Sequence, residues 1–342
     1  MVQPVMEITM KAYHLTATGF DGLKPVEVDI PRPQAGEVLI KLHAASLNYI
    51  DLAVASGAFP APQLPLIPVA DGAGEVVECG EGVAAYKPGD RVLPHFLPDW
   101  QAGRLPSLES RPMRGITVPG SLADYLVMPA YGLASMPGHL SYEEGATLSI
   151  AATTAWKAVR TGNLCPGKTV LLLGTGGVSL FALQFAKASG ARVIIISSSD
   201  KKLDQARVLG ADEVINYRRV DAWDENVLEL TDGQGVDLVV ETVGPETFAR
   251  SLNATAIEGT VFMVGFISGD MLNVSLLPVL LKTLRLVGSN TGSLADFREM
   301  VTAIGANGLR PVIDRSFDFD EARQAYELMA QGGHFGKIAI RI

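Results

Sequence analysis

A glycine-rich turn between an apolar strand and a helix carries the clearest chemistry in this sequence. The apolar run Val170–Leu173 ends at a Gly-Thr-Gly-Gly turn, and residues with helical apolar spacing follow. In such a turn Gly174 permits a tight bend and Gly176 lets the backbone approach a phosphate, while the helix N-terminus offers unpaired N–H groups to the anion. The pattern predicts a dinucleotide bound through its pyrophosphate. The residues predicted to bind there are Gly174, Gly176, Gly177 and Val178.

This turn departs from the usual GxGxxG pattern at the third glycine, where the chain has Ser179. That position allows the helix to lie close to the strand, and serine is only slightly larger than glycine. We expect a small adjustment and no loss of binding. The structural alternative is an ordinary glycine-rich turn without a ligand.

The end of the following strand bears on which dinucleotide is bound. Ser197 stands where NAD-binding chains carry an acidic residue for the ribose 2′-OH. Serine removes the charge that would repel a 2′-phosphate, and Ser198, Ser199 and Lys202 could bind that phosphate. We therefore favour NADP(H), with NAD(H) open if the Asp200 side chain turns toward the cofactor.

The composition is that of a well-packed enzyme and argues against several classes of partner. The 342 residues suit two domains rather than one core. A net charge of −9 argues against nucleic acid or an anionic membrane, and the apolar runs fall far short of the roughly 20 residues of a membrane helix. With two cysteines and no secretory signal pattern, we expect a cytoplasmic location. Met1 to Thr9 are expected to form a short leader.

The elements that must position the turn fall into two groups. Short strands with Gly/Pro turns dominate from Met10 to about Leu133, whereas strands and helices alternate after Ser141. We predict an α/β fold with a doubly wound parallel sheet of the Rossmann type over 135–292. A mostly antiparallel β domain would comprise 1–134 and 293–342, with the terminal KIAIRI as a returning strand. A long irregular segment, Pro94–Pro119, is expected to be functional.

Several segments along the chain carry a resemblance to a known family. They are ASLNYIDLAVASG, DGAGEVVECGEGV, KPGDRV, GSLADYLVMP, AATTAWKAV, TGGVSLFALQFAK, LGADEVINYR, DLVVETVG and HFGKIAI. In order and spacing they resemble the medium-chain dehydrogenase/reductase superfamily, and within it the zinc-lacking quinone oxidoreductase branch related to zeta-crystallin. The resemblance implies a GroES-like catalytic domain carrying both chain ends, a central Rossmann domain, a cleft between them, and a homodimer formed through the Rossmann domains.

The same resemblance bears on zinc. Zinc-dependent relatives hold a catalytic zinc with two cysteines and a histidine, and these positions fall on Asn48, Ile150 and Ala70 respectively. Asp71 stands where those relatives carry a glutamate. Alanine and isoleucine cannot ligate a metal, and neutral asparagine is a poor zinc ligand. The lobe that holds a structural zinc falls within Pro94–Pro119, which has no cysteine, so the resemblance implies a protein without zinc.

The resemblance also assigns roles to single residues. Asn48 and Tyr49 would face the nicotinamide and substrate, Asn48 as a polar orienting group and Tyr49 as a donor to the carbonyl oxygen or a packed aromatic. Asp51 is interpreted as a proton relay or as an acceptor for local backbone donors, and Phe96 and Trp100 as stacking surfaces or loop anchors. Further predicted cofactor contacts are Thr154, Tyr217, Val243, Val264, Phe266, Asn290 and Lys337.

Loss of the metal favours conjugated carbonyl substrates. Hydride addition to a simple ketone builds an alkoxide, which zinc stabilises by several kcal/mol. The charge formed on a quinone or enone is delocalised, so hydrogen-bond donors can suffice. We therefore predict an NADPH-dependent, metal-free oxidoreductase of quinones or α,β-unsaturated carbonyls. The alternatives are a metal-free alcohol or aldehyde dehydrogenase, which His95 could serve, and an NADPH-binding sensor or moonlighting protein with little turnover.

Overall fold

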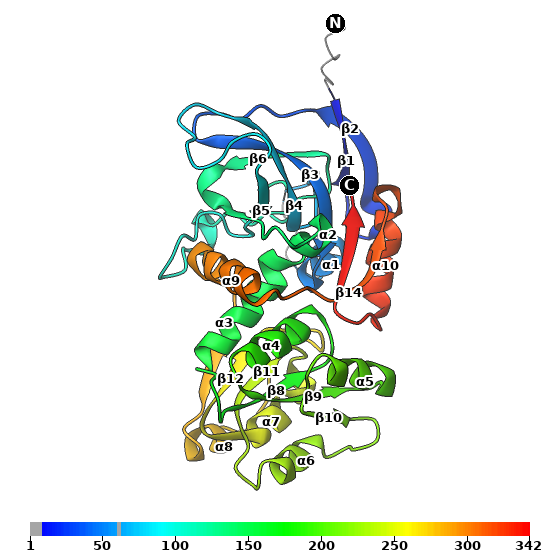
Figure 1. The fold of residues 1–342 in the computed structure, drawn as a ribbon. Helices are drawn as coiled ribbons and strands as arrows, with labels where there is room; N and C mark the ends of the chain where they lie inside the picture. The colour runs from blue at the N-terminus through cyan, green and yellow to red at the C-terminus, as the bar shows by residue number, and fades with distance from the viewer. Residues whose placement is uncertain (1–8, 60–62) are drawn as a thin grey trace, which may run out of the picture. The chain divides into compact units, whose positions relative to one another are not determined.

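The chain folds into two compact units. The computed structural model describes residues 9–59 and 63–342. Unit 1 comprises Met1–Ile150 and Ser293–Ile342, and unit 2 comprises Ala151–Gly292 (Figure 1). All but the last residue of the expected leader lies outside the described residues; Thr9 begins the first strand.

Unit 2 is built on a six-stranded parallel sheet in the order β10-β9-β8-β11-β12-β13. The order reverses between β8 and β11, which is the switch point of a doubly wound sheet. Figure 1 shows α4 and α5 on one face of this sheet and α6, α7 and α8 on the other. The predicted Rossmann fold is thereby confirmed. The elements are α3 (Thr153–Thr161), β8 (Thr169–Leu173), α4 (Gly177–Ala188), β9 (Arg192–Ser197), α5 (Asp200–Val208), β10 (Glu213–Asn216), α6 (Trp223–Leu230), β11 (Val236–Glu241), α7 (Pro245–Ala254), β12 (Thr255–Met263), α8 (Leu277–Leu281) and β13 (Arg285–Gly288).

Unit 1 is the predicted, mostly antiparallel β domain. Its larger sheet runs β14-β15-β3-β4-β5-β7, with β6 also paired to β3, and among its described strand pairs only β14 and β15 run parallel. The C-terminal strand β15 pairs with β3, so the returning strand is confirmed. The strands are β1 (Thr9–Leu15), β2 (Leu23–Asp29), β3 (Glu37–Leu47), β4 (Asp71–Cys79), β5 (Arg91–Pro94), β6 (Tyr125–Pro129), β7 (Leu133–Ser135), β14 (Ile313–Phe317) and β15 (Lys337–Arg341); the helices are α1 (Tyr49–Ser56), α2 (Tyr142–Ala146), α9 (Leu294–Asn307) and α10 (Ala322–Gln331).

The segment 135–150, expected to belong to the Rossmann domain, packs instead in unit 1. Its helix α2 lies against β3, β4 and β15. Gly145 of α2 approaches Leu93 and Ala73 so closely that a Cβ there would press on their side chains. The change from strand-rich to helical sequence therefore precedes the structural boundary by about one helix, because α2 covers the β sheet of unit 1.

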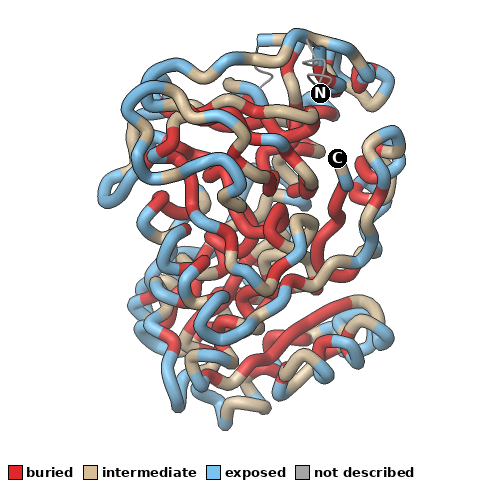
Figure 2. The backbone as a smooth tube through the Cα atoms, turned by 45° about the horizontal axis from the view of Figure 1, so that its top comes forward, coloured by how far each residue is buried: buried red, intermediate tan, exposed pale blue. Residues whose placement is uncertain are grey.

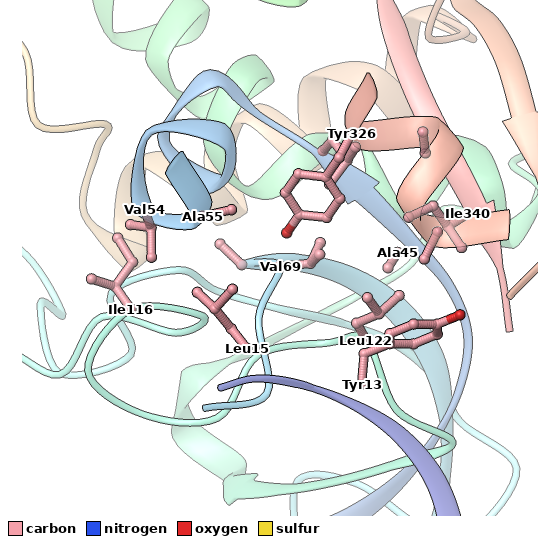
Figure 3. Close-up of a cluster of buried hydrophobic side chains, with 14 of the residues drawn as sticks. Tyr13, Leu15, Ala45, Val54, Ala55, Val69, Ile116, Leu122, Tyr326 and Ile340 are labelled. Carbon is pink, nitrogen blue, oxygen red and sulfur yellow. The ribbon is translucent and has the colours of Figure 1, made fainter. Parts of the chain in front are cut away.

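A hydrophobic cluster fills the interior of unit 1 between α1, α10 and the strands. Figure 2 shows the buried stretches of chain in red, with exposed turns in pale blue. In Figure 3 the ring of Tyr326 from α10 lies among Val69, Ala55 and Ala45. Its hydroxyl is fully buried and makes no hydrogen bond to any described residue. Burial raises the pKa of this phenol well above its usual value.

The long segment after β5 is anchored in this cluster by several of its side chains, while residues 101–104 and 107–110 are exposed. Phe96 and Trp100 are both buried, and they pack with Met113 and Ile116 of the same segment. The Trp100 indole N–H donates to the carbonyl of Gly103 at 3.1 Å. Phe96 and Trp100 were interpreted as stacking surfaces or as loop anchors, and in the structure they are loop anchors. No helix in the described part of the chain is long and apolar enough to cross a membrane.

Candidate functional site

The glycine turn of unit 2 has the geometry of an anion site. Gly174 has φ +72°, a conformation that favours glycine, and its N–H donates to the carbonyl of Ile196 at the end of β9. Gly176 precedes α4, and no side chain caps that helix start. Around Gly176 there is no atom within 4 Å of where a Cβ would project. Backbone N–H groups at the start of α4 are thus available to a phosphate.

Ser179, which replaces the third glycine of the pattern, is accommodated by a hydrogen bond to the preceding strand. Its side chain is buried, and its hydroxyl donates to the carbonyl of Leu173, the last residue of β8, at 2.7 Å. The hydroxyl therefore ties helix α4 to the strand at the point where glycine would otherwise allow close packing. This is the small adjustment that the sequence indicated.

A buried carboxylate shapes the carboxyl end of β11 beside the turn. Glu241 accepts hydrogen bonds from the N–H groups of Val243 and Gly244 and from the hydroxyls of Thr247 and Ser251. The Thr242 hydroxyl donates to the carbonyl of Leu173 at 2.7 Å, which joins this loop to the end of β8. Sequence reasoning missed Glu241, although a charge that closes the apolar run LVV is itself a signal of a buried, satisfied carboxylate.

Several predicted cofactor residues meet at this edge of the sheet. The N–H of Val264 donates to the carbonyl of Glu241, and Ser268, two residues after Phe266, donates its N–H to Val243. Asn290 follows β13, the edge strand of the same sheet. Thr154 is buried near the start of α3, which packs against α4. Val243, Val264 and Asn290 thus follow the ends of β11, β12 and β13 at the carboxyl edge, where open parallel sheets bind ligands.

The serines at the end of β9 and directly after it form a second polar group in unit 2. Ser197 is buried, and its carbonyl accepts from the N–H of Tyr217; Ser198 is partly buried. The Ser199 hydroxyl caps α5 by accepting from the N–H of Lys202. The side chain of Asp200, the residue that left NAD(H) open, is bound by Asn216 at 2.6 Å and by Arg219. That carboxylate is therefore already paired within the protein.

Unit 1 holds a buried polar network formed by Asn48, Asp51, Asp71 and Lys337. Asn48 precedes α1, and its amide nitrogen donates to Asp71 at 2.9 Å while its amide oxygen accepts from the Lys337 ammonium at 2.6 Å. Lys337 also donates to the carbonyl of Leu47 and lies 3.8 Å from Asp71. Lys337 was predicted to reach the cofactor; the structure places its ammonium on Asn48, the predicted orienting group.

The two carboxylates of this network have different partners. Asp51 accepts from the N–H groups of Asn48 at 2.7 Å and Ala70 at 2.9 Å, so it satisfies backbone donors, one of its two predicted roles. Asp71 also accepts from the N–H of Ile150. Burial raises the pKa of both carboxyls, that of Asp51 to about 6, against the lowering effect of these hydrogen bonds and of Lys337. Burial lowers the pKa of Lys337, which the two carboxylates oppose.

Tyr49, the other predicted catalytic residue, is the first residue of α1 and is partly buried. It follows Asn48 directly, so the two predicted catalytic residues share one helix start. Sequence reasoning did not include Asp71 among the site residues. Its place at the start of an apolar strand was the available signal, since a lone buried acid needs partners.

The residues at the three expected catalytic zinc positions do not fit a zinc ion. Ala70 and Ile150 offer no donor atom, and the Asn48 amide oxygen faces an ammonium group that would repel a metal cation. In the described ranges, no group of three or more His, Cys, Asp or Glu side chains could hold a metal ion. His95 is fully buried and packs against Phe297, with Nδ1 3.0 Å from the carbonyl oxygen of Leu97.

Comparisons with known proteins agree with this architecture. The family model described as "Alcohol dehydrogenase GroES-like domain" matches residues 34–138, and that described as "Zinc-binding dehydrogenase" matches 177–306. The second match includes none of the positions 48, 70 and 150. Its description therefore adds nothing about ligands at those positions in this chain.

The similar proteins span this chain almost completely. A "Zinc-type alcohol dehydrogenase-like protein" of Schizosaccharomyces pombe is 40% identical, covering 96% of this chain and 98% of its own. An "Acryloyl-coenzyme A reductase" of Metallosphaera sedula is 28% identical, covering 93% and 96%. The crystal structure of a putative alcohol dehydrogenase from Sinorhizobium meliloti aligns with a TM-score of 0.92 at 35% identity, covering 99% and 100%.

Proposed function

The chain belongs to the medium-chain dehydrogenase/reductase superfamily of oxidoreductases that use a pyridine nucleotide, and from this premise we propose that it is an NADPH-dependent, metal-free reductase of quinones or α,β-unsaturated carbonyls. The observation that carries the proposal is the pair of hydrogen bonds on the Asn48 side chain. Where zinc-dependent relatives need a metal ligand, this chain has an amide held between Asp71 and the Lys337 ammonium.

This amide can act on a carbonyl oxygen without a metal. The Asn48 Nδ2 carries two hydrogens, one of which is donated to Asp71. The second can be donated to the oxygen on which negative charge develops. Asp71 and Lys337 hold the amide in one orientation, so the donor needs no reorganisation during the reaction. One neutral donor suits a delocalised phenolate or enolate better than an alkoxide.

Unit 2 supplies the residues that would hold the nucleotide. The N–H groups at the start of α4 would bind the pyrophosphate, and the reduced nicotinamide supplies the hydride when bound. We assign recognition of a 2′-phosphate to Ser197, Ser198, Ser199 and Lys202, which lie between the end of β9 and the first turn of α5. The pairing of Asp200 with Arg219 supports the preference for NADPH, because it lessens the charge that would repel the phosphate.

The test is nucleotide oxidation by chelator-treated protein. We expect saturable NADPH oxidation with a planar ortho-quinone or an enone, unchanged by the chelator and slower with NADH. Ser197→Asp should weaken NADPH at least about tenfold through like-charge repulsion and leave NADH binding intact. Turnover restored only by added zinc, or equal use of both nucleotides, would contradict the metal-free or the NADPH part respectively.

Two other functions are distinguished by the same assay. A metal-free alcohol or aldehyde dehydrogenase would oxidise simple alcohols and would not reduce conjugated acceptors. Several similar proteins are named alcohol dehydrogenases, including one of Geobacillus stearothermophilus. His95, which could have served such a reaction, is buried against Phe297. Tight NADPH binding with no turnover on any acceptor would favour the sensor.

We also propose that the protein works in the cytoplasm. We further propose that it forms a homodimer, in which unit 2 binds unit 2 of a second copy of this chain. Strand β13 is the edge of the sheet, and among the described strands it pairs with β12 alone. Beside it, exposed apolar side chains gather on α8 and the neighbouring segments: Ile257, Leu276, Leu277, Leu280, Leu281 and Leu286. An unpaired strand edge with an apolar surround is a site for association.

A further inference from the structure

Arg114 is a fully buried arginine that the proposed chemistry does not use. It lies in the long segment between β5 and β6 and is among the largest fully buried side chains of the described chain. Its backbone N–H donates to the carbonyl of Phe96, and its Nη2 donates to the Ser121 hydroxyl at 2.6 Å. Its Nε and Nη1 make no hydrogen bond to any described residue. Such a charge is strongly unfavourable unless nearby acids compensate it.

The compensating acids are those of the buried polar network. Asp71 and Asp51 both stabilise the charged guanidinium, while burial lowers the pKa of Arg114 to about 10. Arg114 in turn lowers the pKa of Asp71. The remaining charged or titratable groups around these carboxyls are Lys337 and Tyr326. Arg114 therefore stays charged at neutral pH and serves as a second cation of the network beside Lys337, with no direct ion pair to either acid.

Ser121 connects Arg114 mechanically to the backbone on both sides of Asp71. The Ser121 hydroxyl approaches the carbonyl of Ala70 at 3.4 Å, and the Ser121 N–H donates to Val69 at 2.6 Å. A Cβ on Gly72 would collide with the Ser121 side chain. The serine hydroxyl that Arg114 holds thus lies against the residue before Asp71 and the residue after it.

The backbone leading into Asp71 is itself strained. Val69 is buried and has φ +71°, an unfavourable conformation for a β-branched residue. The segment around Arg114 maintains it: the N–H of Gly120 donates to Ile67 at 2.7 Å and that of Leu122 to Pro68 at 3.2 Å. Strain persists only where surrounding contacts over-determine it. Here those contacts and Ser121 fix the direction in which the Asp71 side chain leaves the strand.

We propose that Arg114 is a positioning residue that acts through Ser121 and the Ala70–Gly72 backbone to fix Asp71, which together with Lys337 orients the Asn48 amide toward the substrate carbonyl. The inference rests on the proposed reductase function. It also gives the long segment after β5 a definite role, because this segment supplies an internal cation and a clamp while its aromatic residues hold it in the core.

The experiment compares Arg114→Met with Arg111→Met, a matched variant of a second buried arginine in the same segment. With NADPH and an ortho-quinone, Arg114→Met should lower kcat about 10- to 100-fold, as for groups that misplace the reacting atoms. The NADPH Kd, measured by fluorescence, should not change. Arg114→Lys should recover part of kcat, because it restores the charge, whereas Arg111→Met should keep the wild-type kcat.

A second measurement does not depend on turnover. The backbone N–H groups of Asn48 and Ala70 both donate to Asp51. Their hydrogen exchange should become faster in Arg114→Met and stay slow in Arg111→Met. If the wild-type protein proves not to be a reductase, this readout still tests the positioning role. Unchanged exchange in Arg114→Met, or equal effects of the two methionine variants on kcat and exchange, would overturn the proposal.

A third variant covers the case in which Arg114→Met does not fold. Ser121→Ala keeps the arginine charge and removes only the oxygen that links it to Ala70. It should reproduce the loss of kcat and the faster exchange at Ala70. Wild-type kcat and exchange in Ser121→Ala would equally overturn the proposal.

Discussion

Two carboxylates and two cations share the interior of unit 1, and their charges cancel. Asp51 and Asp71 are opposed by Lys337 and Arg114, and all four side chains are buried. Attraction between such charges roughly offsets the cost of removing them from water, whereas deleting one partner leaves an uncompensated charge. The network is therefore better suited to fixing orientations than to stabilising the fold.

The variant Lys337→Met tests whether the four buried charges compensate one another. Loss of the ammonium leaves Asp71 without its nearest cation and removes the donor to Asn48, so the free energy of unfolding should fall by about 3–5 kcal/mol. The double variant Asp71→Asn/Lys337→Met should lose less than the sum of the two single variants. Denaturant unfolding of the four proteins measures the coupling, and strict additivity would contradict a shared network.

The pH dependence of stability should carry the signature of Asp51. Its pKa rises from 3.8 to about 6 on folding, chiefly through burial, so the folded protein binds this proton more tightly than the unfolded chain does. The resulting stabilisation is complete below about pH 4 and is lost as the pH rises through about 6. A shift of this size corresponds to roughly 2–3 kcal/mol.

Unfolding free energies measured from about pH 4 to about pH 7 test this expectation. The difference between the wild type and Asp51→Asn should decline across that range. Parallel curves for the wild type and Asp51→Asn would contradict the shift.

At the scale of elements, the strand-turn-helix of β8 and α4 combines two kinds of glycine. Gly174 needs its positive φ, whereas Gly176 has φ −80° and ψ −178°, which any residue adopts. The first glycine serves the fold and the second leaves room for a ligand. Their roles can therefore be separated by the same substitution at each position.

Gly174→Ala should destabilise the protein by about 1–2 kcal/mol because alanine is strained at that φ. Gly176→Ala should leave the unfolding free energy unchanged and weaken NADPH binding at least about tenfold, since its methyl group would occupy the phosphate position. Calorimetric unfolding and a fluorescence titration of both variants give the two quantities. Wild-type NADPH affinity in Gly176→Ala would place the pyrophosphate elsewhere.

Sequence patterns predicted the elements whose contacts are local or periodic. The buried strands of unit 2, the turn at Gly174 and helix α4 follow from runs and spacings within a few residues. Arg114 could not be found in this way, because an arginine in a segment rich in Pro, Arg and Ser is typical of a solvated loop. Its burial depends on Ser121 and on acids carried by α1 and β4, which no local pattern reveals. Lys337 was singled out, but its contact with Asn48 required the pairing of β15 with β3.

At the scale of the whole molecule, the apolar surface beside β13 makes a prediction about assembly. Leu280 and Leu281 are 69% and 79% exposed in the single chain, so a partner would remove a large apolar area from water. The wild type should sediment as a dimer of 36.3 kDa chains. The double variant Leu280→Glu/Leu281→Glu should sediment as a monomer.

Val208→Glu provides the control for this change. Val208 is 89% exposed on α5, which packs against β9 and β10 at the opposite edge of the sheet from β13. A glutamate there adds the same kind of charge without touching the proposed interface, so the dimer should persist. A monomeric wild type, or dissociation of both variants, would contradict association through β13.

The chain order of the two units also constrains how the protein is made. Unit 2 is one continuous stretch, whereas unit 1 is interrupted after Ile150 and resumes at Ser293. During synthesis, β3 and the two buried aspartates are complete long before β15 leaves the ribosome with Lys337, because the whole of unit 2 is made in between. Unit 2 is complete once Gly292 has been made, but until Lys337 is made unit 1 lacks one of the two cations that oppose its acids. A nascent chain stalled before Lys337 should therefore be a client for chaperones that bind unfinished β sheets.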